Sequence, residues 1–211
     1  IRKQFAAITP QVDALHDLYQ ILHKRRAKRG AIDFDSQETR ILFDGQRKIS
    51  QIIPVDRTAA HRLIEECMLC ANVCSAKFLE KVDIPALYRV HEGPSEDRLK
   101  SVRDFLAELG IGLGGGEDPQ PEDYQRVLRS AKGRDDAPVI QSVLLRSMSQ
   151  AVYQPDNLGH FGLAFEAYTH FTSPIRRYAD LLVHRAIRYL IRSPKKRPNV
   201  HRAEGAKPLD Q

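Results

Sequence analysis

The most informative part of the chain is residues 160–185, which read HFGLAFEAYTHFTSPIRRYADLLVHR. Ser173 is a good N-cap residue and Pro174 suits the first helical position, so we expect a helix to begin here and to run to about Ile191. The spacing predicts that its buried face carries a row of apolar side chains: Ile175, Tyr178, Leu182, Ala186 and Tyr189.

The N-terminus of this predicted helix has the features of an anion site. It offers unpaired backbone N–H groups, two hydroxyls and two guanidinium groups, which belong to Thr172, Ser173, Arg176 and Arg177. Such a group favours phosphate. Asp180 can orient one guanidinium, because it is four residues from Arg176 and three from Arg177. The plain alternative is an ordinary capped helix with an Arg–Asp pair on its surface.

Upstream, the sequence predicts a further helix and a small antiparallel unit. Residues 10–29 are expected to form a helix that Pro10 opens and Gly30 ends. Residues 31–53 then change to a period of two. Asp44-Gly45 in their middle is a hairpin signal. We therefore expect two short paired strands between the first helix and the next.

The longest helix is predicted over residues 55–82, where apolar side chains occur on nearly all sides, so we expect it to be buried. Cys67, Cys70 and Cys74 share one face because their spacing is i, i+3 and i+7. We interpret them as small apolar core residues, since free cysteine is among the most buried residue types. Zinc is the alternative, although no second Cys-x-x-Cys pair follows. Glu65 lies on the same helix, where a carboxylate requires a partner or a task.

Residues 93–138 differ from the rest because they are polar and glycine-rich. We interpret them as a surface helical excursion, followed by a mostly apolar helix over 138–151. The glycine run at 112–116 lacks the lysine of a phosphate-binding loop and follows no strand, so we expect a turn there. Residues 193–211 are rich in proline and basic residues, and we interpret them as a linker.

The composition is that of a globular protein, with 42% hydrophobic and 28% charged positions among 211 residues. It excludes a disordered tail, a collagen-like fibre and a small disulfide scaffold. No run of 18 apolar residues occurs, so we expect no membrane span. The net charge is +6, and the whole excess lies from His184 onward, which suggests a polyanion partner at that end. The three clustered cysteines suit a reducing compartment, and we expect a cytoplasmic location.

Residues 159–185 resemble, almost letter for letter, the signature of the RNB exoribonucleases. The run Arg-Gly-Ala-Ile-Asp-Phe at 29–34 and the segments 63–72 and 85–91 also match the bacterial ribonuclease R branch. The resemblance covers essentially the whole chain. It implies an α+β, mostly helical fold in which residues 1–192 are the C-terminal half of an RNB catalytic domain with a small antiparallel strand contribution.

The resemblance also implies an activity and a cofactor. Enzymes of this family hydrolyse RNA processively in the 3′→5′ direction to nucleoside 5′-monophosphates, with a divalent metal that is usually magnesium. Their metal ions are held by a cluster of aspartates, and no such pattern occurs in these 211 residues. We therefore expect Mg²⁺ to be held by aspartates upstream of this chain, and the chain alone to be inactive. The implied partner is the single-stranded 3′ end of RNA, and the full-length enzyme is expected to be a monomer whose missing C-terminal RNA-binding domain follows residues 193–211.

Position by position, the resemblance assigns roles to single residues. Arg176 resembles the arginine that contacts the scissile phosphate, where it would stabilise developing charge. This choice of Arg176 over its neighbour rests on the resemblance alone. Phe34 resembles an aromatic that clamps the bases at the 3′ end, although core packing explains it equally well without the resemblance. Glu65 resembles the carboxylate near the terminal ribose, where a hydroxyl contact favours RNA over DNA. Supporting or phosphate-contacting roles are expected for Thr172, Ser173, Arg177, Tyr178 and His184.

Two other functions are compatible with the sequence. A catalytically inactive RNA-binding scaffold would have kept the motif at 160–185, and the state of the upstream aspartates would distinguish it from an enzyme. A zinc-binding module around Cys67 and Cys70 would carry stoichiometric zinc, which we do not expect.

Overall fold

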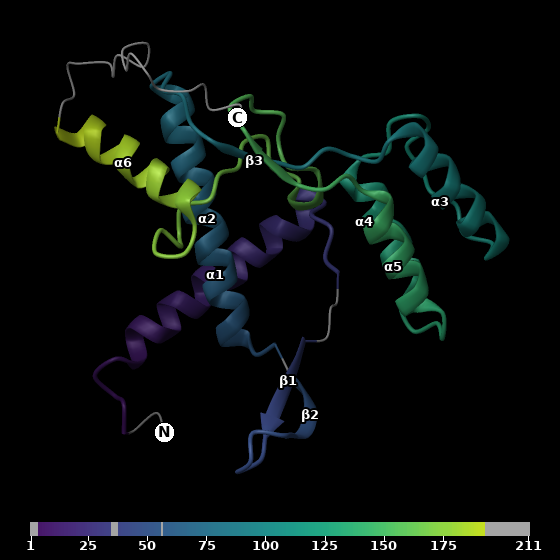
Figure 1. The fold of residues 1–211 in the computed structure, drawn as a ribbon, viewed down its shortest axis with the longest axis horizontal. Coiled ribbons are helices and arrows are strands. Elements are labelled where there is room, and N and C mark those ends of the chain that lie inside the picture. The colour runs from purple at the N-terminus through teal and green to yellow at the C-terminus, as the bar shows by residue number, and fades with distance from the viewer. Residues whose placement is uncertain (1–3, 35–37, 56, 193–211) are drawn as a thin grey trace.

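The computed structural model describes residues 4–34, 38–55 and 57–192, so the predicted linker at 193–211 lies outside the described residues. Figure 1 shows helix α1 (Thr9–Arg29) crossing helix α2 (Ala59–Lys81), with helix α6 (Tyr178–Arg192) beside α2. A second group of helices, α3 to α5, lies on the other side of the short strand β3. The fold is α+β and mostly helical, as the sequence predicts.

Helix α1 ends where the sequence predicts. Gly30 follows it with a φ of 80°, in the left-handed region that residues with a Cβ rarely adopt. This reversal turns the chain into Ala31 and Ile32, which are buried. Of the residues in α1 itself, only Tyr19 is buried.

The predicted antiparallel unit is present as a hairpin. Strand β1 (Glu38–Phe43) pairs with strand β2 (Ile49–Val55), with Ile41 opposite Ile52. The turn is closed by the Asp44 carboxylate, which accepts the backbone N–H groups of Gln46 at 2.8 Å and Lys48 at 2.9 Å. The hairpin projects away from the helices (Figure 1).

Helix α2 is present, but the expectation that it is buried nearly all round is wrong. Its buried residues form one face: Glu66, Leu69, Asn72, Ser75, Ala76 and Leu79. Cys70 and Cys74 are exposed and Cys67 is half-buried, so the cysteines are not core residues. The polar residues of the buried face can be there because they find partners, and apolar spacing alone does not reveal such partners.

Residues 93–138 contain helices α3 (Glu96–Glu108) and α4 (Pro121–Ala131), which pack with α5 (Ala137–Ser147) into a three-helix unit. This unit has the largest cluster of buried apolar residues among those described, including Val102, Leu106, Tyr124, Val127, Ile140 and Leu144. The predicted excursion is therefore a packed unit that shares its core with α5.

Two short strands connect the helical groups. Strand β3 (Tyr88–Val90) pairs antiparallel with strand β4 (Val152–Gln154). After β4 the chain passes through a 3₁₀ turn, η1 (Phe161–Leu163), whose Gly162 N–H donates to His91 Nδ1 at 3.0 Å. A Cβ at Gly162 would lie 3.0 Å from that ring, so the close approach favours glycine.

The sequence predicts that helix α6 starts at Pro174. It begins four residues later, at Tyr178. The Ser173 carbonyl accepts the N–H groups of Arg176 and Arg177, which closes a turn instead of the first turn of the helix. The predicted buried face is also wrong in part, because Ile175 is fully exposed and Tyr178 and Tyr189 are exposed. The buried residues of α6 are Ala179, Asp180 and Val183. None of the described helices is both long enough and apolar enough to span a membrane.

Candidate functional site

A hollow of about 300 Å³ lies between α2 and the segment that precedes α6. It brings together Glu65 and Arg177, two of the residues that the sequence predicts for the site. The other residues that line it are mostly apolar or aromatic: His61, Ile64, Met68, Leu69, Asn72 and Tyr168. An apolar hollow with a few charged groups at its edge is the usual form of a ligand site.

Asn72 of α2 fixes the backbone that leads to the arginines. Its Oδ1 accepts the N–H of Phe171 at 2.9 Å and that of Thr172 at 3.3 Å, while its Nδ2 donates to the Tyr168 hydroxyl at 2.9 Å. Asn72 is buried and makes contacts that sequence reasoning missed. One feature of the sequence could have indicated these contacts: Asn72 lies on a helix that is predicted to be buried, on the same face as Glu65.

Asp180 orients Arg177 and not Arg176. Its two carboxylate oxygens accept from Arg177 Nε at 2.8 Å and Nη2 at 2.9 Å, and Oδ1 also accepts the Ser173 N–H at 2.7 Å. Burial opposes the charge of Asp180, but these hydrogen bonds outweigh it and lower the pKa of the carboxyl below its usual value. Arg176 is exposed, and its side chain has no ion pair within the described part of the chain.

The remaining predicted residues of this segment lie in different surroundings. Tyr178 is exposed, whereas the His184 ring stacks on Phe171 with 4.1 Å between ring centroids and contacts the Phe171 carbonyl oxygen through Nε2 at 2.9 Å. His184 therefore supports the backbone of the segment. The Thr172 hydroxyl is buried and makes no hydrogen bond with any described residue. A buried hydroxyl without a partner is unusual in a folded protein.

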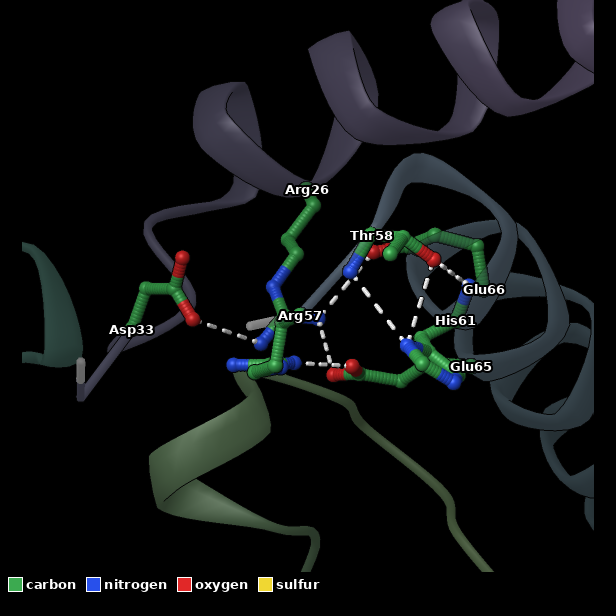
Figure 2. Close-up of polar contacts among 7 residues, drawn as sticks. All are labelled: Arg26, Asp33, Arg57, Thr58, His61, Glu65 and Glu66. Carbon is green, nitrogen blue, oxygen red and sulfur yellow. Dashed lines mark hydrogen bonds and ion pairs between the residues drawn. The ribbon is translucent and has the colours of Figure 1, made fainter. Parts of the chain in front are cut away.

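Glu65 is held between two arginines (Figure 2). Its Oε1 accepts from Arg26 Nη1 at 2.9 Å, and its Oε2 contacts Arg57 Nη2. Burial opposes the charge of Glu65, but the two guanidinium groups outweigh it and lower the pKa of the carboxyl below its usual value. Glu65 is therefore ionised at neutral pH and can accept a hydrogen bond but not donate one.

A second hollow of about 510 Å³ adjoins Glu65 on the side of α4 and α5. It is lined by five cationic and three acidic side chains: Arg26, Arg57, Arg62, Arg129 and Lys132, with Asp33, Glu65 and Glu66. The cations come from α1, from the start of α2 and from the end of α4, so three separate parts of the chain supply positive charge to one hollow. Such a surface attracts a polyanion.

Phe34 is half-buried and packs against the core of the three-helix unit. The preceding residue, Asp33, contacts Arg26 Nη2 at 3.2 Å. Phe34 therefore directly follows a residue that contacts the arginine that holds Glu65. The core-packing explanation of Phe34 accounts for its burial, and its exposed part remains available to a ligand.

The described residues contain no group of three or more histidine, cysteine, aspartate or glutamate side chains arranged to hold a metal ion. These described residues therefore do not fit a magnesium site of their own.

The RNB domain family matches residues 2–193, and the chain belongs to this family. It is 55% identical to ribonuclease R of Vibrio cholerae over 191 residues and 50% identical to that of Escherichia coli over the same length. Each match covers 90% of this chain but only 23% and 24% of those proteins. The chain therefore spans about a quarter of the length of these relatives.

Solved structures agree with this assignment. The chain is similar to Mycoplasma genitalium RNase R in complex with double-stranded RNA, with a TM-score of 0.83 and 31% identity, over 89% of this chain and 34% of that one. It also resembles yeast Ssd1, a pseudonuclease, with a TM-score of 0.59 and 28% identity over 68% of this chain and 18% of that one.

Proposed function

We propose that the chain is the later part of the catalytic domain of a 3′→5′ exoribonuclease that hydrolyses RNA to nucleoside 5′-monophosphates. The observation that supports this most directly is the hollow between α2 and the segment before α6, because it joins Glu65 to Arg177, which directly follows the exposed Arg176 in the chain. The relatives named ribonuclease R support the reaction class. Residues 1–192 would belong to the catalytic domain and residues 193–211 to a basic linker.

In this proposal, Arg176 contacts the scissile phosphate. Its side chain is free to do so, whereas Arg177 is held by Asp180. A guanidinium near the phosphate stabilises the charge that develops there as the bond breaks. The Thr172 hydroxyl and Ser173 supply further polar contacts, and the cationic hollow beside Glu65 attracts the RNA backbone.

At the 3′ end, Glu65 would accept a hydrogen bond from a ribose hydroxyl and Phe34 would pack against a base. A carboxylate that is held ionised on both sides can accept this bond, and deoxyribose lacks the 2′-hydroxyl that would donate it. The magnesium ions of the reaction would be held by aspartates outside this chain and would supply the activated water. The proposal also includes a cytoplasmic location and a monomeric full-length enzyme.

Arg176→Ala in the full-length protein tests the proposal. We expect turnover of a single-stranded oligoribonucleotide to fall about 100-fold or more, with little change in RNA affinity, because many other phosphates remain bound. Arg188→Ala on the exposed side of α6 is a matched control and is expected to keep wild-type turnover. Wild-type turnover in Arg176→Ala would refute the assigned role.

A catalytically inactive RNA-binding scaffold is the second candidate. The structural likeness to Ssd1, a pseudonuclease, favours it, because it shows that this fold occurs in a protein without nuclease activity. The two candidates differ in one measurement. The full-length protein with magnesium releases mononucleotides if it is the enzyme, and binds RNA without shortening it if it is the scaffold.

A further inference from the structure

Arg26, near the end of α1, contacts three carboxylates from two separate segments (Figure 2). Its Nη1 lies 2.9 Å from Glu65 Oε1 and 3.0 Å from Glu66 Oε1, and its Nη2 lies 3.2 Å from Asp33 Oδ1. Glu65 and Glu66 belong to α2, whereas Asp33 directly precedes Phe34. One guanidinium therefore connects both parts of the site at the proposed 3′ end.

The Arg26–Glu66 pair is too buried to be an ordinary surface ion pair, whereas Glu65 and Asp33 are partly exposed. The side chain of Arg26 is 11% exposed and that of Glu66 is 8% exposed. Taking charges out of water carries a desolvation cost that only good geometry offsets, so a buried cluster of this kind persists where its orientation matters or where it specifies the fold. Glu65 is one of the three carboxylates that balance the charge of Arg26, and it also lines both hollows. The cluster therefore ties the buried guanidinium to the lining of the candidate site.

The contact fixes the orientation of the Glu65 carboxylate. Arg26 holds Oε1 from one side and Arg57 holds Oε2 from the other, so rotation of the group would break at least one charge-assisted hydrogen bond. Each carboxylate oxygen still has a free lone pair that can accept from a hydroxyl. Arg26 also has the planar fork needed to reach three carboxylates at once, which a lysine ammonium lacks.

We propose that Arg26 is a positioning residue for recognition of the RNA 3′ end: by orienting Glu65 toward the terminal ribose and holding Asp33 beside Phe34, it sets the preference of the enzyme for ribose over deoxyribose. Arg26 does not touch the ribose itself and acts through Glu65. The inference rests on the proposed function, in which Glu65 accepts the hydroxyl hydrogen bond.

The test uses the full-length protein and two oligonucleotides of the same sequence, one all-ribose and one with 2′-deoxyribose at its 3′-terminal residue. The measured quantity is the ratio of kcat/KM for the two substrates, which does not depend on the fraction of enzyme that is correctly folded. Arg26→Lys, which keeps the positive charge, is expected to lower the ratio about tenfold, the effect of one charge-assisted hydrogen bond. Glu65→Gln is expected to lower it by a similar factor.

Two further variants separate positioning from a general structural role. In a Glu65→Gln background, Arg26→Lys is expected to lower the kcat/KM ratio no further, because Arg26 affects the ratio only through Glu65. Arg29→Gln is the matched control on the same helix, since Arg29 donates to the Leu163 carbonyl at 3.0 Å and lies over the Phe165 ring. It is expected to lower thermal stability and to leave the ratio unchanged. If Arg26→Lys is poorly soluble, the double variant Arg26→Gln/Glu66→Gln removes the same contact without leaving a buried unpaired charge.

The outcomes are distinct. A ratio within twofold of wild type in both Arg26 variants, together with a lowered ratio in Glu65→Gln, overturns the role of Arg26 and leaves the proposed function standing. An unchanged ratio in Glu65→Gln overturns the ribose contact itself, and the inference about Arg26 with it. A lowered ratio in Arg29→Gln would show that any disturbance of α1 has this effect, and would also overturn the inference.

Discussion

The Oδ1 atom of Asn72 lies 2.9 Å from the backbone nitrogen of Phe171, a residue 99 positions further along the chain. This amide connects the middle of α2 to the segment that carries the arginines, and it accepts the next backbone N–H as well. The position of the segment relative to Glu65 therefore depends on one buried side chain.

Replacing Asn72 with leucine is expected to destabilise the protein strongly. The change leaves two backbone N–H groups without acceptors and the Tyr168 hydroxyl without its donor, so we expect a loss of about 3 kcal/mol in the free energy of unfolding. Urea denaturation measures this loss. Tyr168→Phe removes only one of the three hydrogen bonds and should cost about 1 kcal/mol. Equal losses in the two variants would contradict the role given to Asn72.

The two adjacent arginines should differ in their effect on stability. Arg177→Ala leaves the fully buried Asp180 carboxylate without its charged partner, and we expect a loss of about 3 kcal/mol. Arg176→Ala should change the free energy of unfolding by less than about 0.5 kcal/mol, because that side chain is exposed. Thermal melts of the two variants side by side check this contrast, and a reversed order would show that Asp180 is satisfied by other means.

The stability of the protein should fall in mild acid because of His160. Burial, together with the charge of His91, lowers the pKa of His160 to about 3. In the unfolded chain the pKa of histidine is about 6.5, so between these values the unfolded state binds more protons. The free energy of unfolding therefore rises with pH across this window and is lost as the pH falls from about 6.5 toward 3.

Melting temperatures between pH 7.5 and 4.5 measure this effect. His160→Asn keeps an acceptor for the Leu163 N–H, which His160 Nδ1 accepts at 3.3 Å, but it cannot take up a proton. The variant should therefore lose less stability on acidification than the wild type. His170, whose pKa burial and the charge of Arg177 lower to about 4, and His91, whose pKa burial also lowers, both add to the remaining slope. Parallel curves for wild type and variant would rule out His160 as a source of the pH dependence.

The 211-residue chain alone should not degrade RNA. Its described residues contain no cluster suited to a metal ion, and the proposed reaction would require one. Incubation with single-stranded RNA and magnesium should therefore release no mononucleotide above background on a denaturing gel, with the full-length protein as the positive control. Processive release by the chain alone would show that a metal site forms from its own residues.

The local signals in the sequence predicted the elements well. Gly30 ends α1 in the left-handed conformation, and Asp44-Gly45 marks the hairpin turn, because both depend on backbone preferences of a few neighbouring residues. The predicted start of α6, at Pro174, was wrong because of contacts between residues several positions apart. The Ser173 N–H is accepted by Asp180, and the Ser173 carbonyl closes a turn, so the chain enters the helix only at Tyr178.

The prediction that α2 is buried on nearly all sides was wrong for a related reason. Its apolar residues surround the helix, so their spacing cannot indicate which side is covered. The covered side contains Glu66 and Asn72, which pair with Arg26 and with the segment around Tyr168. These partners lie 40 and 96 residues away, and only the tertiary fold brings them together. The same limit explains why the choice between Arg176 and Arg177 could not be made from spacing alone.

The exposed apolar residues of α1 affect how samples of the chain behave. Val12, Leu15, Leu18 and Ile21 are between 42% and 54% exposed. Exposed apolar surface of this kind promotes self-association as the protein concentration rises. Association that occurs only between folded chains raises the apparent melting temperature with concentration. The stability differences predicted above should therefore be compared at one fixed, low protein concentration, with light scattering to confirm that wild type and variant have the same particle size.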